Sequence, residues 1–412
     1  MFKQFNLPSI PKQITFTIVP LALIIMGDSI LYVILPSNYE IFGFKRFLNI
    51  DPVFWIGFIL SINRFVRFFS NVFASKILNS LGLRNSLFIS TTLGGLSTIG
   101  YGVFKGVFLF ILLRILWGIS YSILRLSYQL KVFSFDKKNY GKYLGYCLGM
   151  QRSGSFIAVT LGVFLCLLIG YETTLIIMGL LFLPSFLFIS RVNNLKNVTH
   201  LSLKVSNWDL FYSTNIKGNR FKLITLSFMK FTSSFTSNGL AIATITPFLM
   251  NVNANKFSTE SIILIAGIVV GFRWIADIFF GVIFGTLSDK FGRFNNITLS
   301  IIFMNLFIII AILKLDFFVT VLCLILMFFV SVSLETSLDA LFGEIVQEKS
   351  RSVEVAKYST WQDLGAAMGP IIGYLIASSF NVTFGYIVSI ILIIFASYMF
   401  YIKCDFRERS PV

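Results

Sequence analysis

The chain has 412 residues, of which 56% are hydrophobic and 13% are charged, and its formal net charge is +16. Ordinary soluble domains carry about 25% charged residues, so this composition excludes a soluble globular protein and indicates that lipid surrounds much of the chain. The positive charge does not indicate nucleic-acid binding, because the basic residues gather in alternate loops, as membrane topology requires.

The apolar runs are long and continuous and do not alternate with a period of two, which favours spanning helices over a β-barrel. The run from Ile14 is too long for a cleavable signal peptide, so we expect it to be the first helix. The sequence predicts an all-α membrane protein with twelve transmembrane helices. In chain order they are 14–35, 53–76, 85–104, 107–130, 142–169, 173–190, 222–249, 261–284, 296–313, 317–341, 358–380 and 384–402.

A polar stretch divides these spans into two sets of six. We expect an N-terminal six-helix bundle at 1–190, a cytoplasmic central linker at 191–221 and a C-terminal six-helix bundle at 222–412. The halves also align as a repeat: 151–154 (QRSG) matches 362–365 (QDLG), an offset of 211 residues, and Gly82 matches Gly292, an offset of 210. Glycine-rich helices can look alike without a repeat, but one nearly constant offset predicts two pseudo-symmetric bundles.

Loop charges set the expected orientation, because cytoplasmic loops are enriched in Lys and Arg. One side receives only Lys45, Arg46, Lys105, Lys256 and Lys314. The other side receives all the remaining loop cations, including those of both termini and of the linker. We therefore expect a multi-pass protein of the cytoplasmic (inner) membrane with both termini in the cytoplasm.

Twelve charged residues fall within the predicted spans. A charge at the bilayer centre costs about 2.5–3.5 kcal/mol, so twelve unpaired charges would cost roughly 30–40 kcal/mol, which exceeds the stability of a typical domain. They must face one another or an aqueous cavity. These candidate substrate-binding and proton-coupling residues are Asp28, Arg64, Arg67, Arg114, Arg125, Arg152, Lys230, Arg273, Asp277, Glu335, Asp339 and Asp363.

The third, sixth, ninth and twelfth predicted helices carry none of these charges, so they are free to face lipid. The fourth helix has a polar stripe at helical spacing, formed by Arg114, Gly118, Tyr121, Arg125 and Tyr128. A helix with one polar stripe inside a membrane lines a path for a polar solute.

Residues 285–293 (GTLSDKFGR) resemble the G-x-L-x-D-R-x-G-R loop of the major facilitator superfamily. The resemblance spans nearly the whole chain and implies the fold of that family. It also implies a conformational latch made by Gly285, Asp289, Gly292 and Arg293. The equivalent loop of the first half departs from the family pattern, because Asn79 stands where the family has an acid.

Three further segments resemble motifs of this family. Arg114 and Gly118 match R-x-x-x-G, whose arginine is often tied to proton coupling. The end of the first helix, 27–36, resembles that of family exporters. Helix 11 resembles the G-x-x-x-G-P packing motif of antiporters, which implies helix packing by Gly365, Gly369, Pro370 and Gly373.

The resemblance also implies that helix 2 meets helix 11, and helix 5 meets helix 8, across the two halves. We hypothesise that Arg64 or Arg67 pairs with Asp363, and that Arg152 pairs with Asp277. The alternative is a pair within one half, such as Arg273 with Asp277.

Asp28, with Arg114 as its partner, is the expected proton-coupling acid. Glu335 and Asp339 are the rival pair, and a purely structural role for Asp28 is the third interpretation. The sequence thus predicts a secondary transporter that moves a small organic solute by alternating access, coupled to protons. Export is favoured by the end of the first helix, and the arginine excess supports the alternative, uptake of an anionic or zwitterionic metabolite.

A membrane solute sensor and a membrane-embedded enzyme are alternatives of other classes. A primary pump is excluded, because the sequence has no G-x-x-x-x-G-K-[ST] motif. The single histidine, His200, and four scattered cysteines indicate no metal site, and we expect no catalytic residues and no cofactor. The expected partners are the substrate, a proton or another coupling ion and the lipid bilayer, with the chain acting as a monomer.

Overall fold

The computed structural model describes residues 10–45, 48–135, 140–193, 220–253, 257–345 and 351–403. These segments are helical apart from short connections. Eight helices among them are long and apolar enough to cross a membrane. The predicted linker at 191–221 lies mostly outside the described residues, as does His200, so the expected bundle boundaries stay a prediction.

The first half is helical over most of its described residues. Its elements are α1 (Lys12–Asn38), α2 (Pro52–Val103), α3 (Val107–Phe133), α4 (Tyr140–Ile157), the π-helical turn η2 (Ala158–Gly162), α5 (Val163–Ile169), α6 (Tyr171–Leu180) and α7 (Phe182–Ile189). The second and third expected spans are both present within α2, and the break between them lies at Gly82, inside the expected connection. The connection is shorter than expected, because the chain is helical up to Gly82, whose φ of 75° is readily accessible to glycine.

The second half follows the same plan. Its elements are α8 (Arg220–Ser234), η5 (Phe235–Ala241), α9 (Ile242–Asn253), α10 (Thr259–Ile275), η6 (Ala276–Phe280), α11 (Gly281–Phe291), α12 (Arg293–Leu313), α13 (Phe317–Ile345), α14 (Arg351–Ser379) and α15 (Val382–Lys403). The expected loop from 285 is helical as far as Phe291, and the chain turns at Gly292 with a φ of 86°. The same glycine turn therefore occurs 210 residues after Gly82, which is the offset of the sequence repeat.

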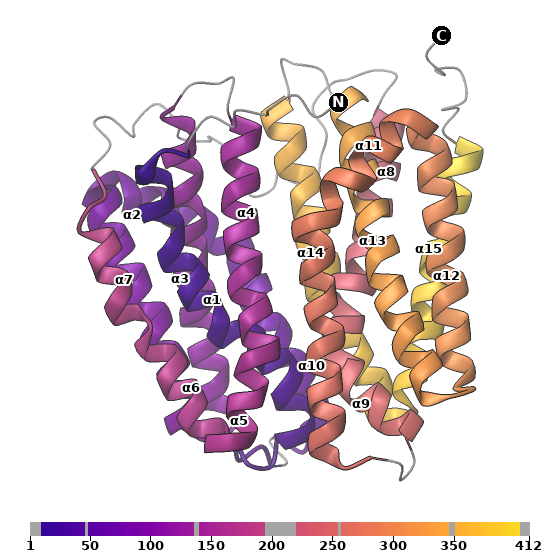
Figure 1. Cartoon of the computed structure of the whole chain (residues 1–412), viewed down its shortest axis with the longest axis horizontal. Helices are drawn as coiled ribbons and strands as arrows, with labels where there is room; N and C mark the ends of the chain where they lie inside the picture. Colours follow the sequence, from indigo (N-terminus) through magenta and orange to yellow (C-terminus); the bar gives the residue numbers. More distant parts are fainter. Residues whose placement is uncertain are drawn as a thin grey trace, which may run out of the picture.

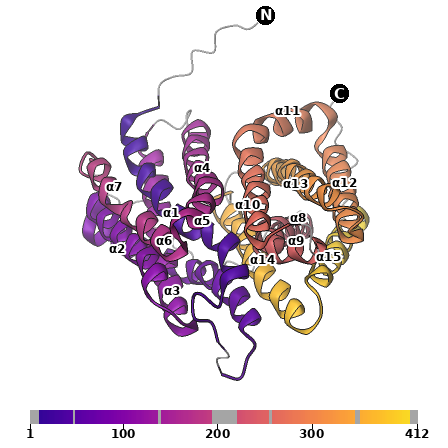
Figure 2. The ribbon, with the colours of Figure 1, turned by 60° about the horizontal axis from the view of Figure 1, so that its bottom comes forward.

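Helices α1–α7 form one bundle and α8–α15 form the other, and the two lie side by side (Figure 1, Figure 2). Burial separates central from peripheral helices. In the most apolar part of α1, 83% of the residues are buried, whereas the corresponding share is 33% for 171–189 and for α15. The helices expected to face lipid therefore do present exposed apolar side chains, such as Leu187 on α7 and Ile391 on α15.

Connections lie on two opposite faces of the molecule. At one face, which we call the linker face, the start of α1 and the ends of α3 and α7 meet: the Gln13 side chain donates to the Arg191 carbonyl, and Lys131 Nζ donates to the Asn193 carbonyl. At the other, the opposite face, Gly106 N donates to the Phe42 carbonyl. The predicted alternation of loops is thus present in the first half.

The same opposite face is tied together in both halves. Lys105 pairs with Glu172 at 2.9 Å in the first half, and Lys314 Nζ donates to Asn251 Oδ1 at 2.9 Å in the second. Asn251 in turn donates to Asn381 Oδ1 at 2.7 Å. Each face therefore collects alternate connections, as helices of this length crossing one layer require.

Towards the opposite face the two bundles are in direct contact. A Cβ added to Gly57 of α2 would lie 2.6 Å from the Pro370 carbonyl oxygen of α14, and one added to Gly267 of α10 would lie 2.2 Å from the Val159 carbonyl oxygen of η2. The second expected span (in α2) therefore meets the eleventh (in α14). The fifth expected span (α4 to α5) meets the eighth (in α10), as the family resemblance implied.

Towards the linker face, α4 and α11 show no such contact at their glycines. Gly149 and Gly145 lie one and two turns from Arg152 along one face of α4, and Gly281 lies one turn from Asp277. A Cβ added at any of these three glycines would meet no atom of another described element within 4 Å. Where these glycines lie, the described parts of the bundles are therefore open towards the linker face, whereas they are closed towards the opposite face.

Candidate functional site

Asp28 of α1 is buried and ion-paired within the first bundle. Its carboxylate accepts hydrogen bonds from Arg114 of α3 and, at 2.9 Å, from Asn63 of α2. Arg114 is fully buried, and it also donates to the Ile59 carbonyl at 2.8 Å and to the Leu60 carbonyl at 3.2 Å. One guanidinium thus ties three helices together, and the nearby carboxylate neutralises its charge.

A second buried cluster lies in the other bundle, where Lys230 of α8 meets two carboxylates of α13. Its Nζ is 2.8 Å from Asp339 Oδ1 and 3.4 Å from Glu335 Oε2. The Tyr358 hydroxyl of α14 donates to Asp339 at 2.9 Å. The Asp339 side chain is 54% exposed and that of Glu335 is 12% exposed, so this cluster leads from accessible surface into the interior.

Asn238, in the π-helical turn η5, connects this cluster to α10. Its amide nitrogen donates to Glu335 Oε1 at 2.8 Å, and its amide oxygen accepts from Arg273 at 3.0 Å. Arg273 also donates to Asp277 of η6. π-Helical turns insert an extra residue into a helix and are frequent at functional sites. Here two such turns supply the side chains that link α8–α9 to α10–α11.

Among the described residues, two ion pairs join the bundles. Arg152 Nε lies 3.2 Å from Asp277 Oδ2, and Arg125 Nη1 lies 3.6 Å from Asp363 Oδ2. The hypothesised Arg152–Asp277 pair is therefore present, together with the alternative pair, Arg273 with Asp277. The side chains of the two bridging pairs are between 19% and 37% exposed, so solvent reaches them between the bundles.

Arg64 does not pair with Asp363, and that part of the hypothesis is wrong. Its Nη1 donates instead to two carbonyls of the second bundle, those of Ala366 and, at 2.9 Å, Asn238. Pro370 has no N–H, so the Ala366 carbonyl four residues earlier lacks its usual helical donor. Asn238 lies in a π-helical turn, where the α-helical ladder is interrupted. Arg64 therefore occupies acceptors made available by helix irregularities.

Arg67, one turn further along α2, also does not pair with Asp363. Its guanidinium carbon lies 3.9 Å from the ring centroid of Tyr121 and 5.5 Å from that of Trp117, both on α3. Gln151 donates to the Tyr121 hydroxyl at 3.0 Å. Among the described residues no carboxylate lies within ion-pair distance of Arg67, and its buried Nε has no hydrogen-bond acceptor.

The glycine motif of α14 lies against the π-helical region of α8–α9. A Cβ at Gly365 would lie 2.3 Å from the Phe231 carbonyl oxygen, and one at Gly369 would lie 2.3 Å from the Leu240 backbone nitrogen. A Cβ at Gly373, one turn further along α14, would lie 2.5 Å from a methyl group of Leu240. The two helix backbones approach closely here, which holds the Ala366 carbonyl beside η5.

The segment expected to act as a latch is helical up to its second glycine. Gly292 makes the turn into α12, and Arg293 Nε lies 2.9 Å from Glu344 Oε1 at the end of α13. Gly285 faces Thr336 of the same bundle at 3.6 Å. The Asp289 side chain lies outside the described part of the chain, so its latch role stays a prediction.

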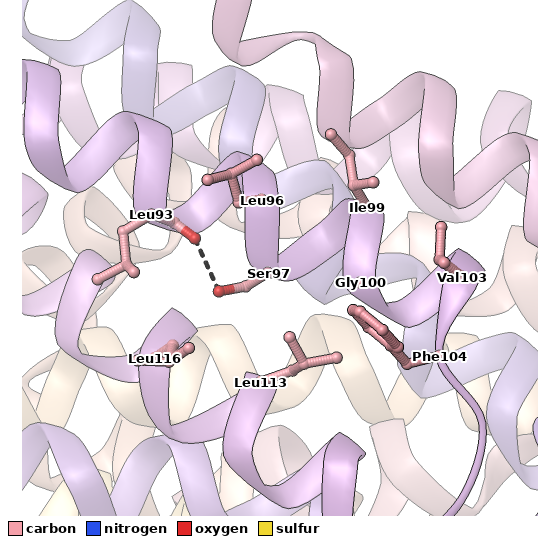
Figure 3. A pocket seen from close by; sticks show the side chains of 9 residues that line it. All are labelled: Leu93, Leu96, Ser97, Ile99, Gly100, Val103, Phe104, Leu113 and Leu116. Carbon is pink, nitrogen blue, oxygen red and sulfur yellow. Dashed lines mark hydrogen bonds between the residues drawn. The ribbon is translucent and has the colours of Figure 1, made fainter.

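A separate apolar pocket of about 420 Å³ lies between the second half of α2 and α3 (Figure 3). Its lining is formed by Leu93, Leu96, Ser97, Ile99, Gly100, Val103, Phe104, Leu113 and Leu116. The one hydroxyl, on Ser97, is satisfied by the Leu93 carbonyl at 2.7 Å. This pocket has no charged group to orient a polar solute, so we do not regard it as the transport site.

Metal chemistry finds no support in the described residues. No group of three or more His, Cys, Asp or Glu residues among them could hold a metal ion. Cys147, Cys166 and Cys323 are buried and unbonded to one another. Cys404 lies outside the described part.

Sequence reasoning missed the polar, uncharged members of the site. Asn63 donates a hydrogen bond to Asp28, and Asn238 donates one to Glu335. The Tyr358 hydroxyl donates one to Asp339. The available signal was an asparagine inside a long apolar run. It is a weak signal, because an asparagine in a span also fits a purely structural hydrogen bond.

The family model of the Major Facilitator Superfamily matches residues 20–335 and 231–412. The chain belongs to the major facilitator superfamily. Members of this superfamily are membrane transporters, and this protein is accordingly a multi-pass membrane transporter of small molecules. A comparison with curated protein sequences finds no match.

Solved structures share the fold of this superfamily member at low sequence identity. A crystal structure of a mutant of the nucleoside transporter NupG has 14% identity and a TM-score of 0.73, covering 95% of this chain and 100% of that one. A bacterial homologue of the human lysosomal transporter Spinster, inward-facing and occupied, has 12% identity and a TM-score of 0.71, with coverages of 97% and 98%. These similarities show the fold, and they leave substrate and coupling to be argued from this chain's own residues.

Proposed function

We propose that this protein is a secondary active transporter that moves a small organic solute across the cytoplasmic membrane by alternating access, coupled to proton movement. The observation that carries the proposal is the asymmetry of the two bundles. They touch towards the opposite face, leave open space at the described glycines of α4 and α11 towards the linker face, and are bridged between these regions by partly exposed ion pairs. Such pairs are suited to break and re-form as the accessible side changes.

The linker face is the cytoplasmic face in this proposal. It carries Lys12, Arg84, Lys131 and Lys290, whereas the described opposite face has Lys45, Lys105 and Lys314. The positive-inside bias therefore favours a structure that is open to the cytoplasm.

Two glycines would permit closure of the linker face. Gly149 of α4 and Gly281 of α11 lie one turn from the paired residues Arg152 and Asp277, and neither carries a side chain that would prevent the helices from approaching. Towards the opposite face, Gly267 already permits the contact that such closure would imitate. A rocking motion about the bridging ion pairs would exchange one contact for the other.

Asp28 is the proton acceptor in this mechanism. Its carboxylate faces Arg114 of α3 and Asn63 of α2, with Ser29 bonded to Ser155 of α4 alongside. Protonation would release Arg114 from its only described carboxylate partner, which couples a charge change to the packing of three helices. Glu335 and Asp339 form the second candidate, because Asp339 is accessible and contacts the buried Lys230.

A substrate-free experiment tests this proposal. A single cysteine replacing Gly149, in a background without the native cysteines, reports by its maleimide labelling rate how open the linker face is. Because maleimide reacts with the thiolate, whose fraction itself depends on pH, the labelling rate is divided at each pH by the rate of the same variant after unfolding. In membrane vesicles we expect this normalised labelling rate to change between acidic and alkaline pH. Asp28→Asn should fix the rate near the acidic value at both pH values, because asparagine imitates the protonated acid.

Parallel variants separate the candidates. Asp339→Asn and Glu335→Gln should preserve the pH response if Asp28 is the coupling acid. If the response disappears in either of these and survives in Asp28→Asn, the proton acceptor lies in the second bundle. A labelling rate that is insensitive to pH in the parent protein would contradict proton coupling altogether.

A further inference from the structure

Among the twelve charged candidate residues, positive charges outnumber negative ones, and the structure shows where the excess positive charge lies. Seven of the twelve candidate side chains are cations and five are carboxylates. Every carboxylate has a cation within ion-pair distance: Asp28, Asp277, Glu335, Asp339 and Asp363 are paired with Arg114, Arg152, Arg273, Lys230 and Arg125. Of these seven cations, Arg64 and Arg67 are the two that have no carboxylate partner among the described residues.

These two arginines lie on neighbouring turns of one face of α2. Arg64 is anchored by carbonyls of the second bundle and lies over Tyr32, 5.2 Å from the ring centroid. Arg67 lies one turn nearer the linker face, which is the open side. Both side chains are partly exposed, so a solute that enters from the linker face can reach them.

The alternative explanation is that backbone carbonyls and aromatic rings satisfy the hydrogen-bond donors and the charge of both guanidiniums. It accounts for Arg64, whose Nη1 has two carbonyl acceptors. It does not account for Arg67, whose buried Nε has no acceptor. Tyr121 lies 3.9 Å beneath the Arg67 guanidinium, and a ring face leaves the N–H edges of a guanidinium free. A planar edge with unused donors matches a carboxylate or phosphate bidentately.

We propose that Arg67, with Arg64 beside it, is the anion-binding end of the transport site, and that the solute is a small organic anion with a carboxylate or phosphate group. This rests on the proposed transport function and names its substrate class. The anion neutralises the local excess of positive charge, and the Gln151–Tyr121 hydrogen bond keeps the ring under the Arg67 guanidinium. Specificity then comes from the fork geometry of arginine, which lysine does not reproduce.

Binding is measured on the purified protein with matched pairs of probes: benzoate against benzamide, succinate against succinamide, and phenyl phosphate against phenol. Trp117 lies 5.5 Å from the Arg67 guanidinium, so tryptophan fluorescence reports occupancy, and Trp117→Phe identifies its contribution. We expect at least one anion to bind and its neutral match to bind about tenfold more weakly or not at all.

Arg67→Gln should weaken that anion about tenfold, and Arg67→Lys should give an intermediate loss, because lysine keeps the charge and loses the fork. Arg84→Gln, which follows the Gly82 turn near the linker face and lies over the Phe88 ring, is the matched control and should bind normally. A folded Arg67→Lys variant keeps the test valid if Arg67→Gln fails to fold.

Equal binding of anions and neutral matches, no binding of any anion, or undiminished anion binding in Arg67→Gln would each overturn the inference. The proposed function has a separate readout. If the Gly149→Cys labelling rate still responds to pH in those cases, proton-coupled alternating access stands and only the substrate class is wrong.

Discussion

Arg64 and Arg114 show two ways in which an arginine is accommodated inside a membrane. Arg114 is paired with Asp28 and also bonds to backbone carbonyls of its own bundle. Arg64 has no carboxylate among the described residues and bonds to carbonyls of the other bundle. The first arrangement is a fixed part of one bundle, whereas the second can persist only while the bundles keep this relative position.

The Asp28–Arg114 pair leads to a prediction about stability. Asp28→Asn leaves Arg114 as a fully buried charge without its counter-ion, which should lower the free energy of unfolding by about 3–5 kcal/mol. Thermal unfolding of the purified protein in detergent checks this as a lowered Tm.

The double variant Asp28→Asn/Arg114→Gln should recover much of that loss, because the uncompensated charge is gone. Asp339→Asn is the matched control: its side chain is 54% exposed, so the change should cost less than about 1 kcal/mol. A Tm for Asp28→Asn equal to that of Asp339→Asn would contradict this account.

At the scale of helices, irregularities decide where polar contacts form. Pro370 in α14 frees the Ala366 carbonyl, which accepts from Arg64 across the bundles. Pro247 in α9 stands four residues after Ala243, whose carbonyl accepts from the Tyr374 hydroxyl at 2.6 Å inside one bundle. The two prolines have the same local effect, but only the contact made possible by Pro370 crosses between bundles.

Pro370→Ala should therefore shift the population of access states. The new N–H at 370 competes with Arg64 for the Ala366 carbonyl, and losing part of this charged hydrogen bond, about 1 kcal/mol, changes a two-state ratio about fivefold. We expect slower maleimide labelling of a cysteine at position 149.

Pro247→Ala tests whether any proline loss would have the same effect. This substitution also restores a backbone N–H, but the carbonyl that it would engage, that of Ala243, accepts from Tyr374 within one bundle. The labelling rate should therefore stay close to that of the parent. Equal changes in both proline variants would show that helix straightening, and not the Arg64 contact, controls access.

For the whole molecule, the pairs between bundles are the contacts that a change of access state must disrupt. Asp363→Arg places a second cation beside Arg125 and should weaken the state seen here. Because both side chains are about one-third exposed, the effect should be modest, at about 0.5–1 kcal/mol, or a two- to fivefold change in labelling at position 149.

The charge swap Arg125→Asp/Asp363→Arg restores an opposite-charge pair and should return the labelling rate towards that of the parent. If the swap behaves like Asp363→Arg alone, the pair does not contribute to the balance between access states.

Orientation in the membrane is also a property of the whole chain. Leu315 is 72% exposed at the opposite face, and Phe291 is 66% exposed beside the linker face. With the linker face in the cytoplasm, a membrane-impermeant maleimide should label Leu315→Cys in intact cells, and Phe291→Cys only after permeabilisation. The reverse pattern would contradict the assigned topology.

Much of the architecture follows from local properties of the sequence. Apolar runs of spanning length, the glycines at 82 and 292, and the alternation of basic loops predict the helices, the repeat and the two faces. The inventory of charged site residues is predictable for the same reason, since a charge in an apolar run is visible in one dimension. The break expected between residues 76 and 85 lies at Gly82, later than the fall in hydropathy indicates, because polar residues continue the helix up to that glycine.

The sequence by itself therefore determined that this chain is a helical membrane protein of two similar halves with twelve charges to accommodate. Only the tertiary structure decided which groups satisfy them: Asp363 meets Arg125, while Arg64 bonds to backbone carbonyls. The physical reason is that helix rotation, π-helical turns and a proline set which donors and acceptors meet. These depend on packing between helices distant in sequence, which no local pattern encodes.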